Sequence, residues 1–365
     1  MNNSNRKKLF IVRRESGGIG GAEKVAHRFV KAFSKHFDTE LIHAGKSING
    51  MRIQGTKGPS WLKCLRFAKS ARKFLGKQKE VLVLSMERGV PGTIYRAGDG
   101  VHLVWQKYKY SNGLRKTLNP MNFILPWLEK ISVEKSKFVV PNSKLIKKHL
   151  HIHYPKIQPN KVSVIYNGYD GSVFRHLKEE RKLELRQKWE ISKDNLNLLF
   201  SGSGWSRKGL GLVLNIASRL SQQGLALKVW VAGRGNQEKY KSLALKLGIG
   251  TQVEFLGSVK NIQELYQTCD YMILPTKYDA FSNSCLEALS CGCRVITTNQ
   301  NGASELINES NGLVLDYTDS DYCKKVAEHM VSFANNKPIF DSRNFENVYG
   351  EEREIKEYYE ILKLA

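Results

Sequence analysis

Two carboxylates, Asp279 and Glu287, stand eight residues apart in the segment YDAFSNSCLEAL, Tyr278–Leu289. The strand-like run YMILPT precedes them and the apolar run CLEALSCG follows, so Asp279 is expected at a strand end and Glu287 in the first turn of a buried helix. A carboxylate there can accept hydrogen bonds from a vicinal diol such as a ribose, while loop amides face phosphate or sugar oxygens. A structural alternative also fits, because Ser284 followed by Glu287 has the spacing of a capping box.

Two adjacent cations, Arg207 and Lys208, lie in another strand, loop and helix pattern, FSGSGWSRKGLGLVLNIASRL. A P-loop needs a lysine directly after its second glycine, but Gly209 is followed by Leu210, so this loop is not a P-loop. Two cations at a helix start could instead neutralise a pyrophosphate together with oriented backbone amides. The alternative is a solvated basic turn.

A glycine-rich turn follows the first apolar strand, in GGIGGAEKVAHRF, and contains Gly20 and Gly21. Glycines at such a turn let a ligand approach the backbone and let helix N-terminal amides face an anion. The glycine spacing of dinucleotide-binding proteins fails here, because its last glycine would fall at Glu23. A tight turn without a ligand is the alternative.

Short apolar runs that alternate with amphipathic stretches are typical of βα units around parallel sheets. The first half contains the strand candidates KLFIVRR, DTELIHA, EVLVLSM, KFVVPNS and KVSVIYNG, and the second half contains LNLLFSG, LKVWVAG, TQVEFLG, YMILPT and CRVITT. We therefore predict an α/β fold with two parallel sheets in two domains, residues 1–170 and 171–345, and a C-terminal amphipathic helix within residues 346–365. Ligands of such folds bind at the carboxyl ends of strands and at domain interfaces.

The formal net charge of +24 at pH 7 belongs almost entirely to one half of the 365 residues. Residues 1–170 hold 33 Lys and Arg against 10 Asp and Glu, a net +23, whereas residues 171–365 hold 25 against 24, a net +1. The two halves are therefore expected to meet different partners. The densest basic segments are 57–79 and 107–116, where cations stand among apolar and aromatic residues (Trp61, Leu65, Phe67, Phe74, Tyr108 and Tyr110).

Patterns for a metal site, a disulfide framework or a membrane span are missing from the sequence. No apolar run reaches the roughly 18 to 20 residues that span a bilayer, and the run LFIV near the start is too short for a signal peptide. Without such a signal, the six cysteines are expected to be reduced thiols. Cys291 and Cys293 lack a second pair at zinc-like spacing, and the alternating His149, His151 and His153 lack acidic or thiol neighbours. We expect a cytoplasmic protein without a metal or cofactor.

Taken together, these segments resemble the retaining GT-B glycosyltransferases of glycosyltransferase family 4, and within it the bacterial lipopolysaccharide core glucosyltransferases. The resemblance covers nearly the whole chain and rests on GGAEKVA, YRAGD, VVPNSKLIKKHL, VIYNGYD, RKG, VAGRGN and the segment Asp279–Leu306. The pattern of two acids separated by seven residues is its most specific element. It implies the GT-B architecture, in which two Rossmann-like domains face each other across a cleft and the C-terminal helix crosses back to the N-terminal domain.

The resemblance also implies roles for individual residues in catalysis. Arg207 and Lys208 would bind the donor diphosphate, and Asp279 would contact the transferred sugar. Glu287 would hold the ribose of the nucleotide, and Asp99 would lie at the acceptor side. Asp279 is a shorter acid than the Glu that the family has at this position. The sequence therefore departs from the family pattern at the residue that would contact the transferred sugar.

The remaining implied residues bind the donor through their backbone. Gly20 and Gly21 would lie beside the donor phosphate, and further amides would come from Phe281, Ser282, Asn283 and Ser284. The basic half would meet an anionic, lipid-linked saccharide acceptor and the anionic surface of the inner membrane, through residues 57–130. The neutral half would meet the nucleotide sugar, and no metal would be required.

The reaction implied by this resemblance is transfer of a hexose, with glucose from UDP-glucose as the expected donor, onto an acceptor such as the lipopolysaccharide core. The expected location is the cytoplasmic face of the inner membrane, to which the protein would attach peripherally. One alternative keeps the fold but uses another nucleotide sugar or a capsular or glycolipid acceptor. A distant alternative is a non-enzymatic nucleic-acid-binding protein, but the sequence has no helix-turn-helix, zinc or RNA-recognition pattern, so we expect no nucleic acid partner.

Overall fold

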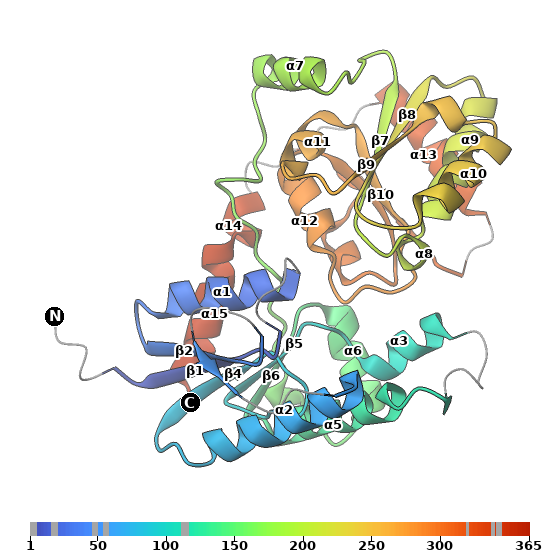
Figure 1. Cartoon of the computed structure of the whole chain (residues 1–365). Coiled ribbons are helices and arrows are strands. Elements are labelled where there is room, and N and C mark those ends of the chain that lie inside the picture. The colour runs from blue at the N-terminus through green and yellow to red at the C-terminus, as the bar shows by residue number, and fades with distance from the viewer. Residues whose placement is uncertain are drawn as a thin grey trace. The chain divides into compact units, whose positions relative to one another are not determined.

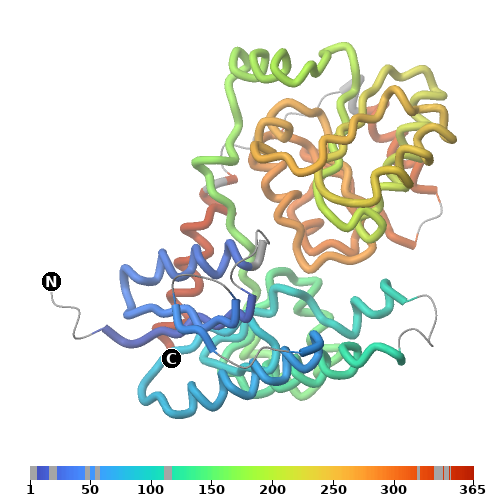
Figure 2. Tube along the Cα trace, viewed as in Figure 1, coloured from blue at the N-terminus to red at the C-terminus, as the bar shows by residue number. Residues whose placement is uncertain are grey.

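The computed structural model describes residues 6–15, 21–45, 50–53, 58–110, 117–318, 321–336, 340 and 345–365. The chain forms two compact units, one of Met1–Asn167 with Glu352–Ala365 and one of Gly168–Glu351. Figure 2 shows the trace leaving the first unit once and coming back to it near the C-terminus. No helix in the described ranges is long and apolar enough to cross a membrane.

In the described part of the first unit, six parallel strands form one sheet in the order β3-β2-β1-β4-β5-β6 (Figure 1). The strands are β1 (Lys8–Val12), β2 (Asp38–His43), β3 (Met51–Arg52), β4 (Val81–Ser85), β5 (Ile94–Ala97) and β6 (Phe138–Pro141). The order reverses between β1 and β4, and such a switch point is where ligands of open α/β sheets bind, at the carboxyl ends of the strands.

The helices of the first unit cover both faces of its sheet. They are α1 (Gly21–Phe33), α2 (Ser60–Leu75), α3 (His102–Lys109), α5 (Met121–Lys135), α6 (Lys144–His153) and α15 (Glu351–Lys363). Because side chains alternate along a strand, Leu9 and Ile11 of β1 pack in a core with α1 and α15. Phe10 and Val12 pack in a second core with α2 and α5.

The C-terminal helix packs in the first unit, as predicted. Tyr358 and Leu362 of α15 are buried in the same core as Phe29 of α1, and the rings of Phe29 and Tyr358 lie 5.0 Å apart. An ion pair between Arg28 and Glu354 adds a polar link between the two helices.

The second unit repeats this arrangement, with six described parallel strands in the order β12-β11-β10-β7-β8-β9. The strands are β7 (Leu196–Ser201), β8 (Leu227–Ala232), β9 (Val253–Gly257), β10 (Tyr271–Leu274), β11 (Arg294–Thr298) and β12 (Gly312–Leu315). The helices are α7 (Glu179–Lys188), α8 (Trp205–Lys208), α9 (Leu210–Gln222), α10 (Gln237–Lys246), α11 (Ile262–Thr268), α12 (Asn283–Ser290), α13 (Tyr322–Asn336) and α14 (Phe345–Tyr349). The order reverses between β7 and β10, so the second switch point lies between these two strands.

The two Rossmann-like sheets confirm the predicted fold class, but one predicted strand is wrong. The segment KVSVIYNG forms no strand and makes one isolated bridge, between Val139 and Val162. It still runs beside β6, because the amides of Ser163 and Ile165 donate to backbone oxygens of that strand at 3.2 and 3.1 Å. The short strands β3, β5 and β12 were not predicted, and β5 was hidden by a buried charge, Arg96, whose guanidinium donates to Asn167.

Candidate functional site

Three predicted site residues converge at the switch point of the second unit. The Oδ2 atom of Asp279 lies 3.1 Å from Nζ of Lys208 and 3.5 Å from Nη1 of Arg207. The two cations follow β7 and the carboxylate follows β10, and these strands are neighbours in the sheet. The strand order therefore brings the two sequence motifs together at one edge of the sheet.

Backbone contacts fix the loop that carries the two cations. Gly209 has a φ of +86°, and a Cβ atom there would lie 2.3 Å from the carbonyl oxygen of Pro275, so the loops after β7 and β10 touch at this glycine. The Arg207 carbonyl accepts from the Lys277 amide at 2.9 Å, and the Arg207 guanidinium donates to the carbonyl of Tyr278 at 2.9 Å. The cations end the short helix α8 and precede α9, whereas the sequence placed them at a helix start.

The charges at this edge are held partly out of water. The side chains of Lys208 and Asp279 are 12% and 17% exposed, whereas that of Arg207 is 40% exposed. Burial alone would raise the pKa of Asp279, but the charges of Lys208 and Arg207 outweigh it and lower the pKa below its ordinary value. Asp279 is therefore ionised, and one carboxylate faces two cations. An edge with excess positive charge suits an anionic ligand.

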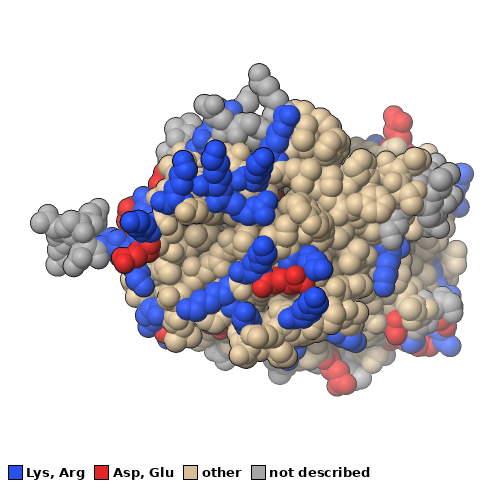
Figure 3. All heavy atoms as spheres, turned by 90° about the horizontal axis from the view of Figure 1, so that it is seen from below, with Lys and Arg blue, Asp and Glu red and all other residues tan. Residues whose placement is uncertain are grey.

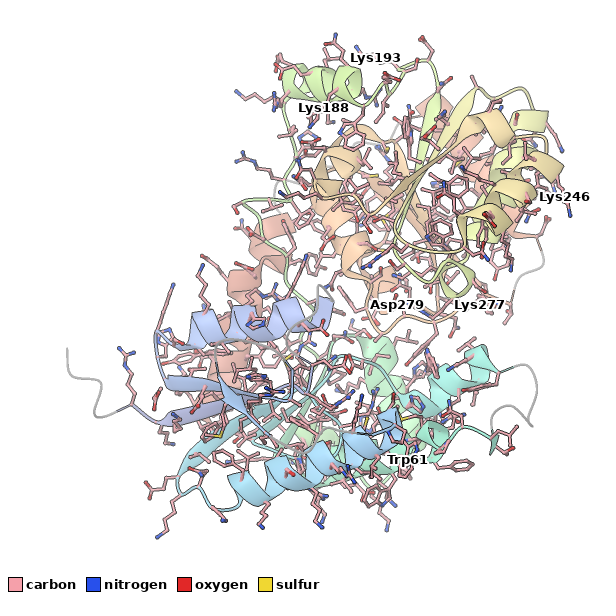
Figure 4. The ribbon with its side chains drawn as sticks, in the orientation of Figure 1. Trp61, Lys188, Lys193, Lys246, Lys277 and Asp279 are labelled. Atoms are coloured by element: carbon pink, nitrogen blue, oxygen red, sulfur yellow. The ribbon has the colours of Figure 1, made fainter. Side chains whose placement is uncertain are left out.

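A third cation, Lys277, belongs to the same loop and was not singled out from the sequence. It is partly buried, and Figure 4 shows it with Asp279 at one edge of the second unit. The sequence feature that could have identified Lys277 as a site residue is its position two residues before Asp279, directly after a predicted strand. The sequence alone could not show that its amide is bonded to the Arg207 carbonyl.

The helix after Asp279 starts earlier than the capping-box alternative requires. Helix α12 begins at Asn283 with Ser282 as its N-cap, so Ser284 lies inside the helix and Glu287 lies beyond its first turn. The hydroxyls of Ser282 and Ser284 are 2.9 Å apart. The capping-box interpretation is therefore wrong, and Glu287 needs another explanation than capping.

The backbone before this helix only partly fits the predicted phosphate contacts. Phe281 and Ser282 are buried, and Asn283 and Ser284 are partly buried. The Ser282 amide already donates to Oδ1 of Asn301 at 3.1 Å, so it is not available to a phosphate. Asn301 follows β11 and was not singled out from the sequence, where NQNG indicates only a turn.

Glu287 interacts electrostatically with Tyr266 of α11. Burial and the charge of Glu287 hold the pKa of Tyr266 well above its ordinary value. The Tyr266 hydroxyl is 2.8 Å from that of Ser201, the last residue of β7. The Tyr266 side chain, whose pKa the charge of Glu287 raises, therefore contacts the end of the strand that precedes Lys208.

Asp99 belongs to the first unit and is not among the residues brought together in the second. It follows β5, and its Oδ2 lies 3.1 Å from Nη1 of Arg13 and 3.8 Å from Nη1 of Arg88, which follow β1 and β4. Partial desolvation of this side chain, which is 42% exposed, would raise the pKa of Asp99, but the charges of Arg13 and Arg88 outweigh this effect and lower the pKa to about 2. Gly20 lies outside the described residues, and Gly21 is the first residue of α1.

Comparison with protein families and solved structures agrees with this fold. Residues 181–337 match the family described as "Glycosyl transferases group 1". The crystal structure of WaaG, a glycosyltransferase involved in lipopolysaccharide biosynthesis, superposes with a TM-score of 0.80 at 18% identity, over 97% of this chain and 99% of that one. The crystal structure of Anabaena HepE in complex with UDP-glucose gives a TM-score of 0.74 at 16% identity, over 98% and 100%.

Sequence relatives cover different shares of the chain. The N-acetylgalactosamine-N,N'-diacetylbacillosaminyl-diphospho-undecaprenol 4-alpha-N-acetylgalactosaminyltransferase of Campylobacter jejuni is 23% identical over 82% of this chain and 83% of that protein. Lipopolysaccharide glucosyltransferase WaaG of Escherichia coli is 27% identical over 44% of this chain and 43% of that protein. Other curated relatives are matched over about half of their length. The two six-stranded parallel sheets therefore form the GT-B fold, as in WaaG, and residues 181–337 of the second unit form a glycosyl transferases group 1 domain, of glycosyltransferase family 4.

Proposed function

We propose that the protein is a retaining, metal-independent hexosyltransferase that moves glucose from UDP-glucose onto an anionic, lipid-linked saccharide. The single observation that carries this proposal is the cluster of Lys208, Arg207 and Asp279 at the carboxyl edge of the second sheet. A partly buried carboxylate beside two cations supports a sugar contact and a diphosphate contact within one small site.

In this proposal the donor lies against the second unit. Arg207 and Lys208 neutralise the diphosphate, Asp279 accepts a hydrogen bond from a sugar hydroxyl, and Glu287 accepts bonds from the ribose. The complex of Anabaena HepE with UDP-glucose supports UDP-glucose as the donor class. Gly20 and Gly21, and the amides of Phe281, Asn283 and Ser284, stay predicted phosphate neighbours.

The proposed chemistry needs no protein nucleophile. The acceptor oxygen forms a bond to the anomeric carbon on the face from which the diphosphate departs, and the bond from that carbon to the phosphate oxygen breaks. The acceptor proton passes to the departing phosphate oxygen. Preorganised cations stabilise the charge that grows on the leaving group. Asp99, with a pKa of about 2, is too weak a base to take this proton efficiently, so we assign it to hydrogen bonding of the acceptor.

The first unit carries the features expected of a surface that meets an anionic membrane. Figure 3 shows the face on which α2 and α5 lie, with many Lys and Arg side chains and few acidic ones. Phe123 and Trp127 of α5 are 61% and 52% exposed. These two residues lie one turn apart on the helix, so their aromatic rings stand on the same side of it, near cations. Each Lys or Arg close to an anionic leaflet contributes about 1 kcal/mol to the free energy of membrane binding.

The structure corrects which apolar residues of this surface can face a membrane. Phe67 of α2 is fully buried, and Phe74 packs edge-on against Phe10 of β1 at 5.5 Å between ring centroids. Both therefore belong to the core of the first unit. Trp61, at the start of α2 (Figure 4), is partly exposed, so the candidate membrane residues among residues 57–130 include Trp61, Phe123 and Trp127.

Names of relatives support a lipid-linked acceptor but point to more than one kind. WaaG is described as a lipopolysaccharide glucosyltransferase, and the Campylobacter relative carries diphospho-undecaprenol in its name. Both acceptors are anionic and membrane-bound, in agreement with the basic first unit. The alternative of another nucleotide sugar or a capsular acceptor shares the same donor site.

An assay of nucleotide release tests the proposal. The protein is incubated with UDP-glucose and either a lipopolysaccharide-core acceptor or an undecaprenol-diphosphate-linked saccharide, and UDP is measured with the anomeric configuration of the product. Acceptor-dependent UDP release with retained configuration supports the proposal. Absence of UDP release from UDP-glucose with both acceptors would contradict it.

A further inference from the structure

Asn301 is a fully buried side chain that links the loops after β10 and β11. Its Oδ1 atom accepts hydrogen bonds from the backbone amides of Ser282 and Ala303, both at 3.1 Å. Its Nδ2 atom donates to the hydroxyl of Thr297 at 3.0 Å and to the sulfur of Cys285 at 3.4 Å. An asparagine amide offers two acceptor sites and two donors, so all four are occupied and the side chain is held in one orientation.

The backbone beside Asn301 clamps the other end of the same loop. The amide of Asp279 donates to the Gln300 carbonyl at 3.0 Å, and the Asp279 carbonyl accepts from the Gly302 amide at 3.0 Å. The segment from Asp279 to Ser282 is therefore bound to residues 300–302 at both of its ends. This segment places the Asp279 carboxylate against Lys208 and leads into the first turn of α12.

We propose that Asn301 is a positioning residue of the donor site, which sets the distance between Asp279 and the start of α12. The proposal rests on the proposed function, because it assumes that the sugar contacts Asp279. The short Asp side chain has little reach of its own, so its backbone must be placed closely for the carboxylate to meet both Lys208 and the sugar. The Ser282 amide serves this clamp and does not bind phosphate.

A matched control exists at the opposite edge of the same sheet. Asn197 is also fully buried; its Nδ2 donates to the carbonyls of Ser192 and Asn195 at 2.8 Å, and its Oδ1 accepts from Nε1 of Trp230 at 3.3 Å. It lies near the amino end of β7, away from the carboxyl ends where Asp279 and Lys208 meet. Asn197→Ala and Asn301→Ala therefore remove similar networks, of which only one supports the site.

The experiment compares KM for UDP-glucose, kcat and Tm for the wild type, Asn301→Ala, Asn301→Asp and Asn197→Ala, with kinetics measured well below every Tm. Both alanine variants are expected to lower Tm. Only Asn301→Ala is expected to raise KM for UDP-glucose, by about tenfold, which corresponds to one lost hydrogen bond. Asn301→Asp keeps the acceptor oxygen for Ser282 and Ala303. Its KM for UDP-glucose should therefore lie close to that of the wild type, while its Tm stays below the wild-type value.

The outcomes separate the positioning role from the proposed function. An Asn301→Ala enzyme with a KM within twofold of the wild type, or an equal KM increase in Asn197→Ala, would overturn the positioning role. A KM in Asn301→Asp that is no better than that of Asn301→Ala would overturn it as well. A wild-type protein that neither binds nor turns over UDP-glucose would instead overturn the proposed function itself.

Discussion

The ammonium of Lys208 and the carboxylate of Asp279 lie 3.1 Å apart, although they follow two different strands of the second sheet. Their pairing has two consequences. It keeps Asp279 ionised despite burial, and it holds the Lys208 ammonium at the carboxyl edge, where a diphosphate would add the negative charge that one carboxylate does not supply.

Removing the lysine tests whether this ammonium acts on the leaving group. Lys208→Ala should lower kcat by roughly two to three orders of magnitude, because loss of one preorganised donor costs about 3 to 4 kcal/mol of barrier. The control is Lys246→Ala, which removes an exposed lysine from α10 of the same unit (Figure 4). A near-normal kcat in Lys208→Ala would contradict the proposal that Lys208 binds the donor diphosphate.

Lengthening the acid tests the division of labour within the donor site. Asp279→Glu should leave UDP affinity nearly unchanged, because UDP lacks the transferred hexose that this side chain is proposed to contact. It should shift the ratio of kcat/KM for UDP-glucose to that for UDP-galactose by roughly tenfold, since a methylene moves the carboxylate relative to the sugar hydroxyls. Calorimetry with UDP and steady-state kinetics measure the two effects. A changed UDP affinity with an unchanged sugar ratio would contradict the assignment.

The pairing of Asp99 with Arg13 and Arg88 predicts a pH dependence of stability. The pKa of Asp99 is about 2 in the folded protein and about 3.9 in an unfolded chain. The unfolded state therefore binds more protons between these values, so the contribution of Asp99 is complete above about pH 5 and is lost as the pH falls toward 2. Melting temperatures measured from pH 6 to pH 3 should decline less steeply for Asp99→Asn than for the wild type. Parallel declines would show that Asp99 does not couple to folding in this way.

The exposed aromatic residues of α5 should bind anionic membranes. At low salt the wild type should sediment with vesicles that contain phosphatidylglycerol and not with pure phosphatidylcholine vesicles. Replacing both Phe123 and Trp127 with serine should reduce binding, because it removes the apolar contribution and leaves the charges. Leu245→Ser is the control, since Leu245 on α10 of the second unit is also an exposed apolar side chain. Failure of the wild type to sediment with the anionic vesicles would refute the membrane surface.

Glycine 209 should be irreplaceable where the loops after β7 and β10 touch. Gly209→Ala adds a Cβ atom at a φ of +86° and 2.3 Å from the Pro275 carbonyl. A left-handed conformation alone costs about 1 to 2 kcal/mol for a non-glycine residue. Gly224→Ala is the matched control, because Gly224 has a φ of +84° and open space around its Cβ position. Thermal unfolding should show a larger decrease in Tm for Gly209→Ala than for Gly224→Ala. Equal decreases in Tm would mean that the two loops do not contact each other at Gly209.

Local sequence patterns predicted most strands because the buried strands of parallel sheets are apolar runs between turn residues. Lys8–Val12 and Tyr271–Leu274 are of this kind. The pattern failed where an extended segment such as Val162–Asn167 makes only an isolated bridge. It also failed for β5, where Arg96 is buried because its guanidinium meets Asn167 and Glu354. Such partners lie far away in sequence, so alternation of apolar residues cannot reveal them.

The same limit applies to the candidate site. Asp279, Arg207 and Lys208 could be selected because each follows a predicted strand and carries a charge. Their mutual contact depends on the order of strands in the sheet, which the sequence pattern does not contain. Asn301 gives no signal of its own, since the positioning role proposed for it depends on hydrogen bonds to Ser282 and to Cys285 of α12, which follow another strand.

The measurement that tests the central claim most directly is a thermal-shift panel of UDP-, GDP- and ADP-linked sugars on the wild type and on Lys208→Ala. A ligand that binds only the folded state raises Tm, by an amount that grows with ligand concentration relative to Kd. We predict that UDP-glucose raises the Tm of the wild type, that uridine alone does not, and that Lys208→Ala loses most of the shift. A wild type whose Tm no nucleotide sugar changes, or an undiminished UDP-glucose shift in Lys208→Ala, would contradict a diphosphate site at Lys208 and Asp279.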